Sequence, residues 1–331
     1  MLSATDADAV ADAYGLRRPA VLEGPVARGQ LGQVWRLDAA EGRYAVKEWF
    51  AEPDLAEVAK DADLVLAARA EGVTTPGIIR TPDGAVAASL PTVAKPPGSG
   101  GGNGTGSTEG TAIRLFEWVD LRPRTRLLDP AAVGAMLAGL HRAGPPTRES
   151  VDNWFSTGVG RASWISLQER VTREGAPFAA VLAALLGDLV AVESVMEPHE
   201  EPIVCHRDLW ADNVLGTADG DVCVIDFENL GPADPSQELA MVLFEFGDDD
   251  PARARAIHTA YLERRGPGRV RRRGHFTMLV AEQAHIGQLA CSRWVGASDE
   301  VERERLAAWF LEIAEDPVTL ARIDRILAAV T

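Results

Sequence analysis

Short runs in which apolar and polar residues alternate, separated by turn residues, predict strands in the first part of the chain. Two such runs lie between residues 21 and 38, on either side of a turn that contains Gly29 and Gly32. A third run, Tyr44–Phe50, holds Lys47 between apolar neighbours. Helical patterns flank these strands and predict helices over Ala7–Tyr14 and Leu55–Glu71.

The next segment, residues 76–90, is expected to form a short β hairpin around the turn Pro82-Asp83-Gly84. Residues 96–110 are rich in Gly and Ser and have almost nothing apolar to bury, so a flexible loop is expected there. Strand patterns at Val86–Leu90 and Ala112–Val119 flank this loop and are expected to pair with each other. A linker between domains is the alternative, but a further strand is needed before the chain leaves the sheet.

From residue 129 onward the pattern is mainly helical. The stretch Pro177–Met196 is apolar nearly all round, which predicts a buried helix. His141 lies at the end of the first of these helices, where packing or capping is a commoner role for His than catalysis. The predicted helices are 129–141, Ser163–Glu174, Pro177–Met196, one that begins at Asp234, Ala252–Arg264, Gly274–Trp294 and Asp299–Val330, the last with a break near Pro317.

Between these helices, two short apolar runs each end close to a carboxylate. Asp208 follows the run Pro202–Cys205, and Asp226 follows the run Val222–Ile225. Turn residues at 217–221 indicate a hairpin whose second strand ends at Asp226. Because a hairpin returns the chain to its starting point, we expect the two carboxylates to lie side by side.

These residue types suit phosphoryl transfer. Asp208 would accept the proton of an attacking hydroxyl, while Asn213 and Asp226 offer the hard oxygen ligands that Mg²⁺ prefers. Lys47 would place a cation on the phosphates. An Asp-x₄-Asn spacing alone is a weak signal, and a lone Lys in a strand is usually solvated. The combination of all four residues in this order favours a phosphoryl-transfer site.

Composition narrows the setting of this chemistry. The 331 residues are 46% hydrophobic and 25% charged, as in an ordinary globular protein, and the net charge of −16 argues against a nucleic-acid surface. That charge is compatible with a cationic partner, although solubility alone also explains it. Cys205, Cys223 and Cys291 form no C-x-x-C pair, no signal-peptide pattern is visible, and the apolar run 178–186 is too short to span a bilayer. We therefore expect a cytoplasmic protein without nucleic-acid or membrane partners.

The central stretch resembles a known family. His206-Arg-Asp-Leu followed by three residues and Asn213 matches the catalytic loop of the protein-kinase superfold, and Ile225-Asp-Phe lies where its Asp-Phe-Gly would be. Together with Leu137-Ala-Gly-Leu-His141 and Glu238-Leu-Ala, these residues are similar to the aminoglycoside phosphotransferase family of small-molecule kinases. The resemblance implies an α+β, bilobal, protein-kinase-like fold. Its expected parts are a nucleotide-binding lobe of residues 1–116, a hinge at 117–122, and a catalytic and acceptor-binding lobe of residues 123–331.

The resemblance also implies roles for single residues. Asp208 would be the catalytic base, Asn213 and Asp226 would hold Mg²⁺, and Lys47 would bind phosphate. Nucleotide would also meet the turn with Gly29 and Gly32, and its purine would meet Glu117 to Val119. A helix acid is expected to pair with Lys47; Asp61 is slightly favoured over Glu57, with Glu71 also considered.

The acceptor is less defined. The chain lacks an Ala-Pro-Glu motif and an activation segment after Asp226, so the usual platform for a peptide is missing. Acidic residues that would bind an amine are Glu228, Glu282 and Asp299. The resemblance implies ATP, with GTP not excluded, and an aminoglycoside, amino sugar or similar amine-bearing acceptor. A choline-, homoserine- or fructosamine-like kinase, and a non-catalytic pseudokinase, stay open as alternatives, as does a role in resistance or in metabolism.

Overall fold

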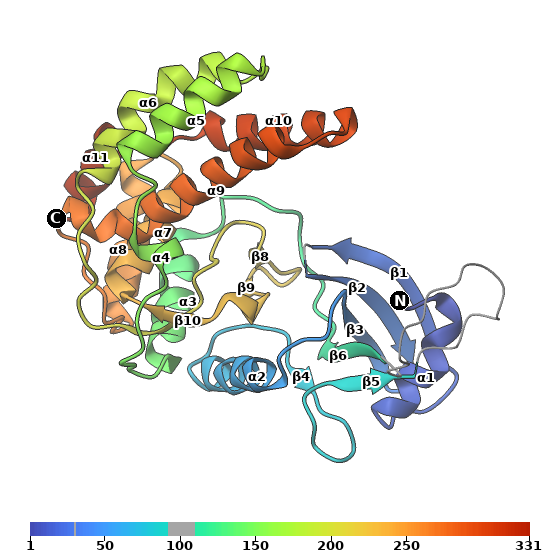
Figure 1. Cartoon of the computed structure of the whole chain (residues 1–331). Helices are drawn as coiled ribbons and strands as arrows, with labels where there is room; N and C mark the ends of the chain where they lie inside the picture. The colour runs from blue at the N-terminus through green and yellow to red at the C-terminus, as the bar shows by residue number, and fades with distance from the viewer. Residues whose placement is uncertain (30, 92–109) are drawn as a thin grey trace.

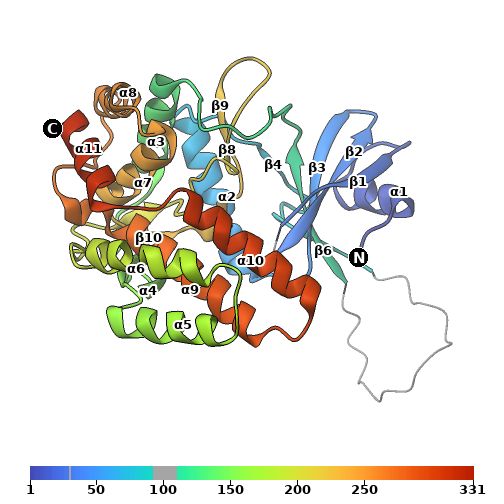
Figure 2. The same cartoon turned by 90° about the horizontal axis from the view of Figure 1, so that it is seen from above.

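The computed structural model describes residues 1–29, 31–91 and 110–331. Except for Gly110, the tract predicted as a loop at 96–110 lies outside the described residues. Two lobes are apparent, one built on a sheet and one mainly helical (Figures 1 and 2). This arrangement agrees with the expected α+β, bilobal class.

A six-stranded antiparallel sheet forms the N-terminal lobe, with the order β1-β2-β3-β6-β4 and with β5 also pairing with β6. Its apolar face packs against helix α1 (Ala7–Ala13), which follows the short η1 (Ala4–Asp6), and buries Val10 and Leu37. Alternation along the strands therefore separates a core face from a solvent face. The strands are β1 (Val21–Arg28), β2 (Gly32–Ala39), β3 (Gly42–Trp49), β4 (Ile78–Ile79), β5 (Ala88–Leu90) and β6 (Thr111–Glu117).

The predicted hairpin of β1 and β2 is confirmed, and its turn is closed by a hydrogen bond from the Gly29 N–H to the Gly32 carbonyl, 2.9 Å. A Cβ at Gly32 would lie 2.3 Å from the carbonyl oxygen of Glu48 on β3, so this position requires glycine. The chain can therefore pass from the turn into close contact with the neighbouring strand.

The hairpin predicted at residues 76–90 is wrong. Ile78 and Ile79 of β4 pair with Phe116 and Leu115, whereas Ala88 of β5 pairs with Ile113. The two short strands thus occupy successive parts of one edge of β6 instead of pairing with each other. The predicted pairing between β5 and β6 is confirmed.

Helix α2 (Leu55–Ala70) lies between the lobes. It begins after Asp54, whose carboxylate accepts a hydrogen bond from the Ala56 N–H at 2.8 Å and so caps the helix. Its apolar residues Leu64 and Ala68 join the main core of the C-terminal lobe. A helix next to the sheet of one lobe is therefore anchored in the core of the other.

The C-terminal lobe is built around α7, which is buried along its whole length. Among the described residues, no helix has the length and apolar character needed to cross a bilayer. The longer helices are α3 (Pro130–Ala143), α5 (Arg161–Arg173), α6 (Ala179–Glu193), α7 (Pro235–Gly247), α8 (Pro251–Glu263), α9 (Thr277–Gly296), α10 (Glu300–Glu315) and α11 (Leu320–Val330), with the shorter α4 (Asn153–Ser156), η2 (Phe227–Asn229) and η3 (Arg273–Phe276).

The buried helix predicted at 177–196 is partly wrong. A helix is present as α6, but only Leu182 and Val192 of it are buried. It packs on one side against a separate cluster that includes Trp164 and Phe178, and its other side carries small residues such as Ala183 that face solvent. Alanine favours helix formation whether or not it is covered, so an Ala-rich apolar pattern does not require burial on every side.

Two small antiparallel pairs carry the central stretch. β8 (Val214–Gly216) pairs with β9 (Val222–Val224), which confirms the predicted hairpin, and β7 (Ile203–Cys205) pairs with β10 (Gly231–Ala233). These strands place the segments after β7 and after β9 beside each other, on the side of the helical lobe that faces the sheet (Figure 1).

Candidate active site

The loop of residues 206–213, predicted from the sequence to be the catalytic loop, is held together by the side chain of Asn213. Its Nδ2 donates a hydrogen bond to the backbone carbonyl of Asp208 at 3.0 Å, and its own backbone carbonyl accepts one from the Ile225 N–H at 2.9 Å. The amide is thereby oriented, because the nitrogen is occupied and the Oδ1 atom keeps its lone pairs. Asn213 therefore connects the loop that carries Asp208 to the strand end that carries Asp226.

The carboxylate of Asp208 is fixed by a residue that the sequence did not single out. Asn229 donates from Nδ2 to Asp208 Oδ2 at 2.9 Å. One carboxylate oxygen of Asp208 is thus occupied by Asn229. Burial raises the pKa of Asp208 above its ordinary value, partly offset by the hydrogen bond from Asn229.

Lys47 reaches this site from the other lobe. Its Nζ lies 3.0 Å from Oδ1 of Asp226, which follows β9 in the left-handed conformation with a φ of 60°. Strand β3 of the sheet is therefore in direct contact with the segment that follows β9. The structure brings together all four residues that the sequence assigned to phosphoryl transfer: Lys47, Asp208, Asn213 and Asp226.

His206 has a structural role in the same loop. Its Nε2 lies 3.2 Å from the Ile225 carbonyl, and its ring meets the edge of Phe227 with the ring centroids 4.8 Å apart. Burial lowers the pKa of His206, so the neutral ring donates its Nε2–H to the carbonyl. The histidine thus fastens the catalytic loop to the segment of Asp226.

The neighbouring Arg207 also holds the two segments together. Its backbone has a φ of 62°, and its guanidinium donates to the carbonyls of Asn229 at 2.7 Å and Leu230 at 2.9 Å. A Cβ at Gly231 would lie 2.4 Å from that guanidinium, so glycine leaves the room it needs. Glu238 of α7 accepts a hydrogen bond from the Arg207 N–H at 2.5 Å and stabilises the left-handed backbone.

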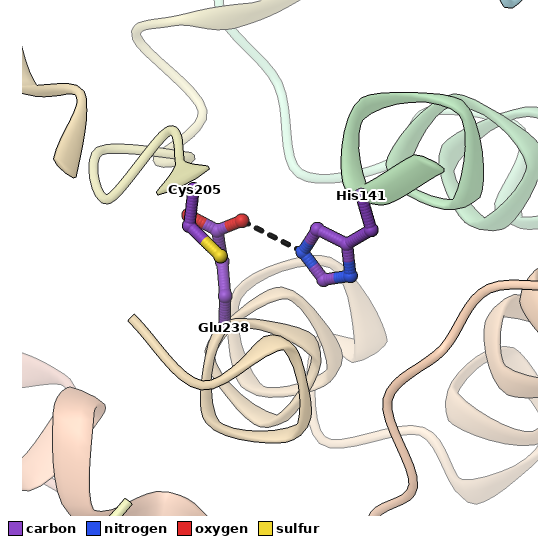
Figure 3. A group of neighbouring side chains, drawn as sticks. All are labelled: His141, Cys205 and Glu238. Carbon is purple, nitrogen blue, oxygen red and sulfur yellow. Dashed lines mark hydrogen bonds and ion pairs between the residues drawn. The ribbon is translucent and has the colours of Figure 1, made fainter. Parts of the chain in front are cut away.

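Glu238 belongs to a buried network, and Figure 3 shows its contact with His141. Its Oε2 lies 2.7 Å from His141 Nε2, and His141 Nδ1 lies 2.7 Å from the hydroxyl of Tyr261. That hydroxyl also accepts from the Gly268 N–H at 2.7 Å. Because an ionised carboxylate can only accept, His141 donates from Nε2 to Glu238. Burial opposes the ionised form of Glu238, but its interactions with His141, with the Arg207 N–H and with His206 together outweigh burial, and the pKa is lowered.

The sulfur of Cys205 lies in the same cluster, and the potential ligand atoms of Cys205, His141 and Glu238 all lie within 4.8 Å of one another. The His and Glu atoms that would bind a metal ion already bond to each other. This cluster therefore has a structural role, because its Glu238 holds the backbone of the catalytic loop at Arg207. The sequence signals were His141 at a helix end, as expected for a packing role, and Glu238 four residues after Asp234.

The expected ion pair between a helix acid and Lys47 is replaced by another pair. Asp61 of α2 lies 3.7 Å from Nη1 of Arg114 on β6, and Glu57 pairs at the surface with Lys60 at 2.8 Å. Burial raises the pKa of Asp61 to about 6, partly offset by Arg114. The prediction that Asp61 pairs with Lys47 is therefore wrong, because the partner of Asp61 is Arg114.

Glu228 is placed differently from its expected role at the acceptor. Its Oε2 lies 2.6 Å from Lys47 Nζ, and its Oε1 accepts a hydrogen bond from Trp49 Nε1 at 2.6 Å. Both carboxylate oxygens are occupied by residues of β3. Glu228 therefore contacts the sheet lobe.

The predicted hinge begins where β6 ends, at Glu117. The Glu117 carboxylate lies 2.8 Å from Arg69 Nη1 of α2 and accepts from the Gly77 N–H at 3.1 Å, so the side chain braces the sheet against the helix. Val119 is half-buried in the irregular segment that follows. Purine binding at 117–119 stays a prediction, as does nucleotide contact at Gly29 and Gly32.

Two further acids were predicted to bind the acceptor. Glu282 of α9 is buried, and its Oε1 accepts from Trp210 Nε1 at 3.0 Å, while its Oε2 has no hydrogen-bond partner in the described part of the chain. Burial raises the pKa of Glu282 to about 8, and the charge of Asp208 contributes. Asp299 instead caps α10 by accepting from the Glu302 N–H at 3.2 Å, which is a structural role.

The donor set suits a hard divalent cation. Asn213 offers an amide oxygen whose nitrogen is already engaged, and Asp226 offers an exposed carboxylate. Oxygen ligands without sulfur or imidazole are the set that Mg²⁺ prefers. The residues present therefore fit the metal that the sequence implied.

Taken together, the two lobes and the meeting of Lys47 with Asp226 define a protein-kinase-like phosphotransferase. The model of one family, described as the phosphotransferase enzyme family, matches residues 24–275. The chain belongs to this family, whose members are small-molecule kinases. No curated protein sequence matches it.

Solved structures agree on the fold. A spectinomycin phosphotransferase in complex with ADP and spectinomycin is 14% identical, with a TM-score of 0.65 over 99% of this chain and 98% of that one. A microcompartment-associated aminopropanol kinase is 16% identical, with a TM-score of 0.57 over 94% and 95%. An amicoumacin kinase in complex with AMP-PNP and Ca²⁺ is 13% identical, with a TM-score of 0.52 over 95% and 94%. At these identities the likeness shows the fold alone.

Proposed function

We propose that the chain transfers the γ-phosphoryl group of Mg-ATP to a hydroxyl of a small, amine-bearing molecule, with Asp208 as the catalytic base. The observation that carries this proposal is the contact between Lys47 and Asp226, 3.0 Å, beside a catalytic loop in which Asn229 fixes Asp208 at 2.9 Å. This charged pair between distant segments supports a role of Lys47 at the phosphates and of Asp226 at the metal. The ADP and AMP-PNP bound to structurally similar kinases support the nucleotide.

The residues of the site divide the work. When bound, Mg-ATP supplies the phosphoryl group and a cation that neutralises its oxygens. Asn213 and Asp226 would hold that cation, and Lys47 would exchange Asp226 for a phosphate. Asp208, held by Asn229, accepts a hydrogen bond from the acceptor hydroxyl and takes its proton as the new bond forms. Positioning and charge stabilisation, with little covalent chemistry by the protein, are what this reaction requires.

Glu282 supports an amine-bearing acceptor. Among the described residues its buried Oε2 has no hydrogen-bond partner, and the half-buried indole of Trp210 bonds to the other oxygen and joins Glu282 to the catalytic loop. A carboxylate in this position gains from an ammonium group, because an opposite charge offsets the cost of burial. The net charge of −16 also favours a cationic acceptor. Spectinomycin and aminopropanol are named with structurally similar kinases and define the first compounds to test.

The test is a panel assay of the purified chain with Mg-ATP or Mg-GTP. Aminoglycosides, aminocyclitols, amino sugars, amino alcohols, choline and homoserine would be offered, with ADP or GDP release and the ³¹P spectrum of the product as readouts. The Asp208→Asn variant should lose about 10³-fold in kcat and keep its nucleotide affinity. Phosphorylation that survives in Asp208→Asn at the wild-type rate would refute the role of Asp208.

A pseudokinase is the second hypothesis. It predicts nucleotide binding without phosphorylation of any acceptor, and it is disfavoured because Lys47, Asp208, Asn213 and Asp226 are all present. Both hypotheses predict nucleotide binding, which calorimetric titration with ADP, with and without Mg²⁺, measures. Nucleotide binding combined with a silent panel would favour the pseudokinase.

A further inference from the structure

The lysine of β3 and an arginine of β6 form adjacent cations. Lys47 and Arg114 are paired directly across the two antiparallel strands, so their side chains leave the same face of the sheet. Arg114 is almost fully buried, donates to the carbonyl of Val58 in α2, and lies 3.7 Å from Asp61. A buried guanidinium needs a carboxylate partner, which commits Asp61 to Arg114.

Glu228 supplies the acid that α2 does not. Among the described residues, the ion pairs of Lys47 are with Asp226 and Glu228, and the pair with Glu228 is the shorter at 2.6 Å. The side chains of Lys47 and Glu228 are only 15% and 16% exposed, so solvent screens this pair weakly. Trp49, two residues after Lys47 and on the same face of β3, holds the other oxygen of Glu228 at 2.6 Å.

The contact between Glu228 and Lys47 matters because of where Glu228 lies in the chain. It lies in η2 between Asp226, which would bind the metal, and Asn229, which fixes Asp208. A single short turn of the helical lobe therefore touches the phosphate-binding lysine and the base. Movement of β3 relative to this turn would displace Lys47 and Asp208 from each other.

We propose that Glu228 is a positioning residue that orients Lys47 in place of the helix acid and fastens the sheet lobe to the catalytic segment. The proposal rests on the proposed function, since Lys47 is assumed to meet the nucleotide phosphates. Because Asp226 also pairs with Lys47, Glu228 can keep the lysine in place when Asp226 turns to the metal. Glu228 then acts through Lys47 and touches neither the acceptor nor the phosphoryl group.

The test is a pair of double-mutant cycles on the full chain, Lys47→Ala with Glu228→Gln and Lys47→Ala with Asp61→Asn. Affinity for Mg-free ADP, measured by calorimetry, and the unfolding midpoint of the free protein are followed beside kcat/KM for ATP. Glu228→Gln should lower kcat/KM for ATP by about 10- to 100-fold and add nothing further in the Lys47→Ala background. Asp61→Asn should have the same effect with and without Lys47, because its partner is Arg114.

Two other roles for Glu228 give different results. If Glu228 bound the acceptor, Glu228→Gln would raise the KM of the acceptor about 10-fold or more. If Glu228 were a metal ligand, the variant would raise the Mg²⁺ concentration needed for half-maximal rate about 10-fold or more. A positioning residue should leave both quantities within about 2-fold of the wild type. Either change, additive effects of Lys47→Ala and Glu228→Gln, or coupling of Lys47 to Asp61 would overturn the proposal. Failure of the wild-type chain to bind nucleotide would overturn the proposed function instead, while the unfolding cycle would still report on the Lys47–Glu228 pair.

Discussion

Two polar networks hold the catalytic segment, and they are built in different ways. One joins the lobes through Glu228 to Lys47 and Trp49, and the side chains of Glu228 and Lys47 are partly exposed. The other lies within the helical lobe, where Glu238 connects His141 to the backbone of Arg207 and every member is buried or backbone. Solvent can reach part of the first network, whereas the second has no solvent to replace its bonds. We infer that the first network sets the position of the two lobes relative to each other. The second network sets the conformation of the catalytic loop.

The largest effect is expected from the buried network. Glu238→Ala removes the acceptor of the Arg207 N–H and the partner of His141, leaving two buried donors unsatisfied. Loss of one member of such a network costs about 3–5 kcal/mol of the free energy of unfolding. Urea or thermal unfolding measures this loss. Glu238→Gln, which keeps one oxygen for the Arg207 N–H, is the control and should lose less; equal losses would mean that the contact with Arg207 contributes nothing.

Asn229→Ala tests the catalytic segment between the two networks. The variant frees Asp208 Oδ2, which now receives a hydrogen bond from Asn229 at 2.9 Å. A base with a mobile carboxylate should lower kcat about 10-fold while the KM values of nucleotide and acceptor stay unchanged. Asn229 is exposed, so the unfolding midpoint should hardly change. A raised KM with an unchanged kcat would assign Asn229 to substrate binding instead.

A matched pair of variants compares the networks directly. Trp49→Phe removes one donor to Glu228, and Tyr261→Phe removes the hydroxyl between His141 and Gly268. Trp49→Phe should raise the KM of ATP about 3- to 10-fold with little change in stability, and Tyr261→Phe should cost about 1–2 kcal/mol in unfolding free energy with the KM of ATP unchanged. Steady-state kinetics and denaturant unfolding on both variants check this. A loss of stability in Trp49→Phe with a raised KM of ATP in Tyr261→Phe would contradict the distinction between the two networks.

The sequence predicted the motif residues and most elements, because strand alternation, turn residues and helix caps are local signals. Lys47, Asp208, Asn213 and Asp226 could be identified in this way, and the structure brings them together. The partner of Lys47 could not be identified from the sequence, because it depends on the register of the sheet. That register places Arg114 opposite Lys47, and Asp61 pairs with Arg114. The pairing of β4 and β5 depended in the same way on the edge of β6. Non-local register is invisible to a pattern read along the chain.

The smallest effect is expected for Glu282, a buried acid that belongs to neither network. Its pKa is raised by burial from 4.5 to about 8, so between these values the folded chain keeps a proton that the unfolded chain has lost. The stability that this proton supports is fully present below about pH 4.5 and is lost as the pH rises through about 8. Glu282→Gln stays neutral and should not show that loss.

Melting curves at pH 6 and pH 9 measure the difference between the two proteins. The melting temperature of the wild-type chain should fall by about 2 °C more than that of Glu282→Gln over this range. A cationic acceptor reverses the balance, because its ammonium favours the ionised carboxylate. Its KM should therefore decrease as the pH rises towards 8 in the wild type and stay flat in the variant. Parallel melting curves would show that Glu282 is already ionised at pH 6, and a flat KM in both proteins would remove it from the acceptor site.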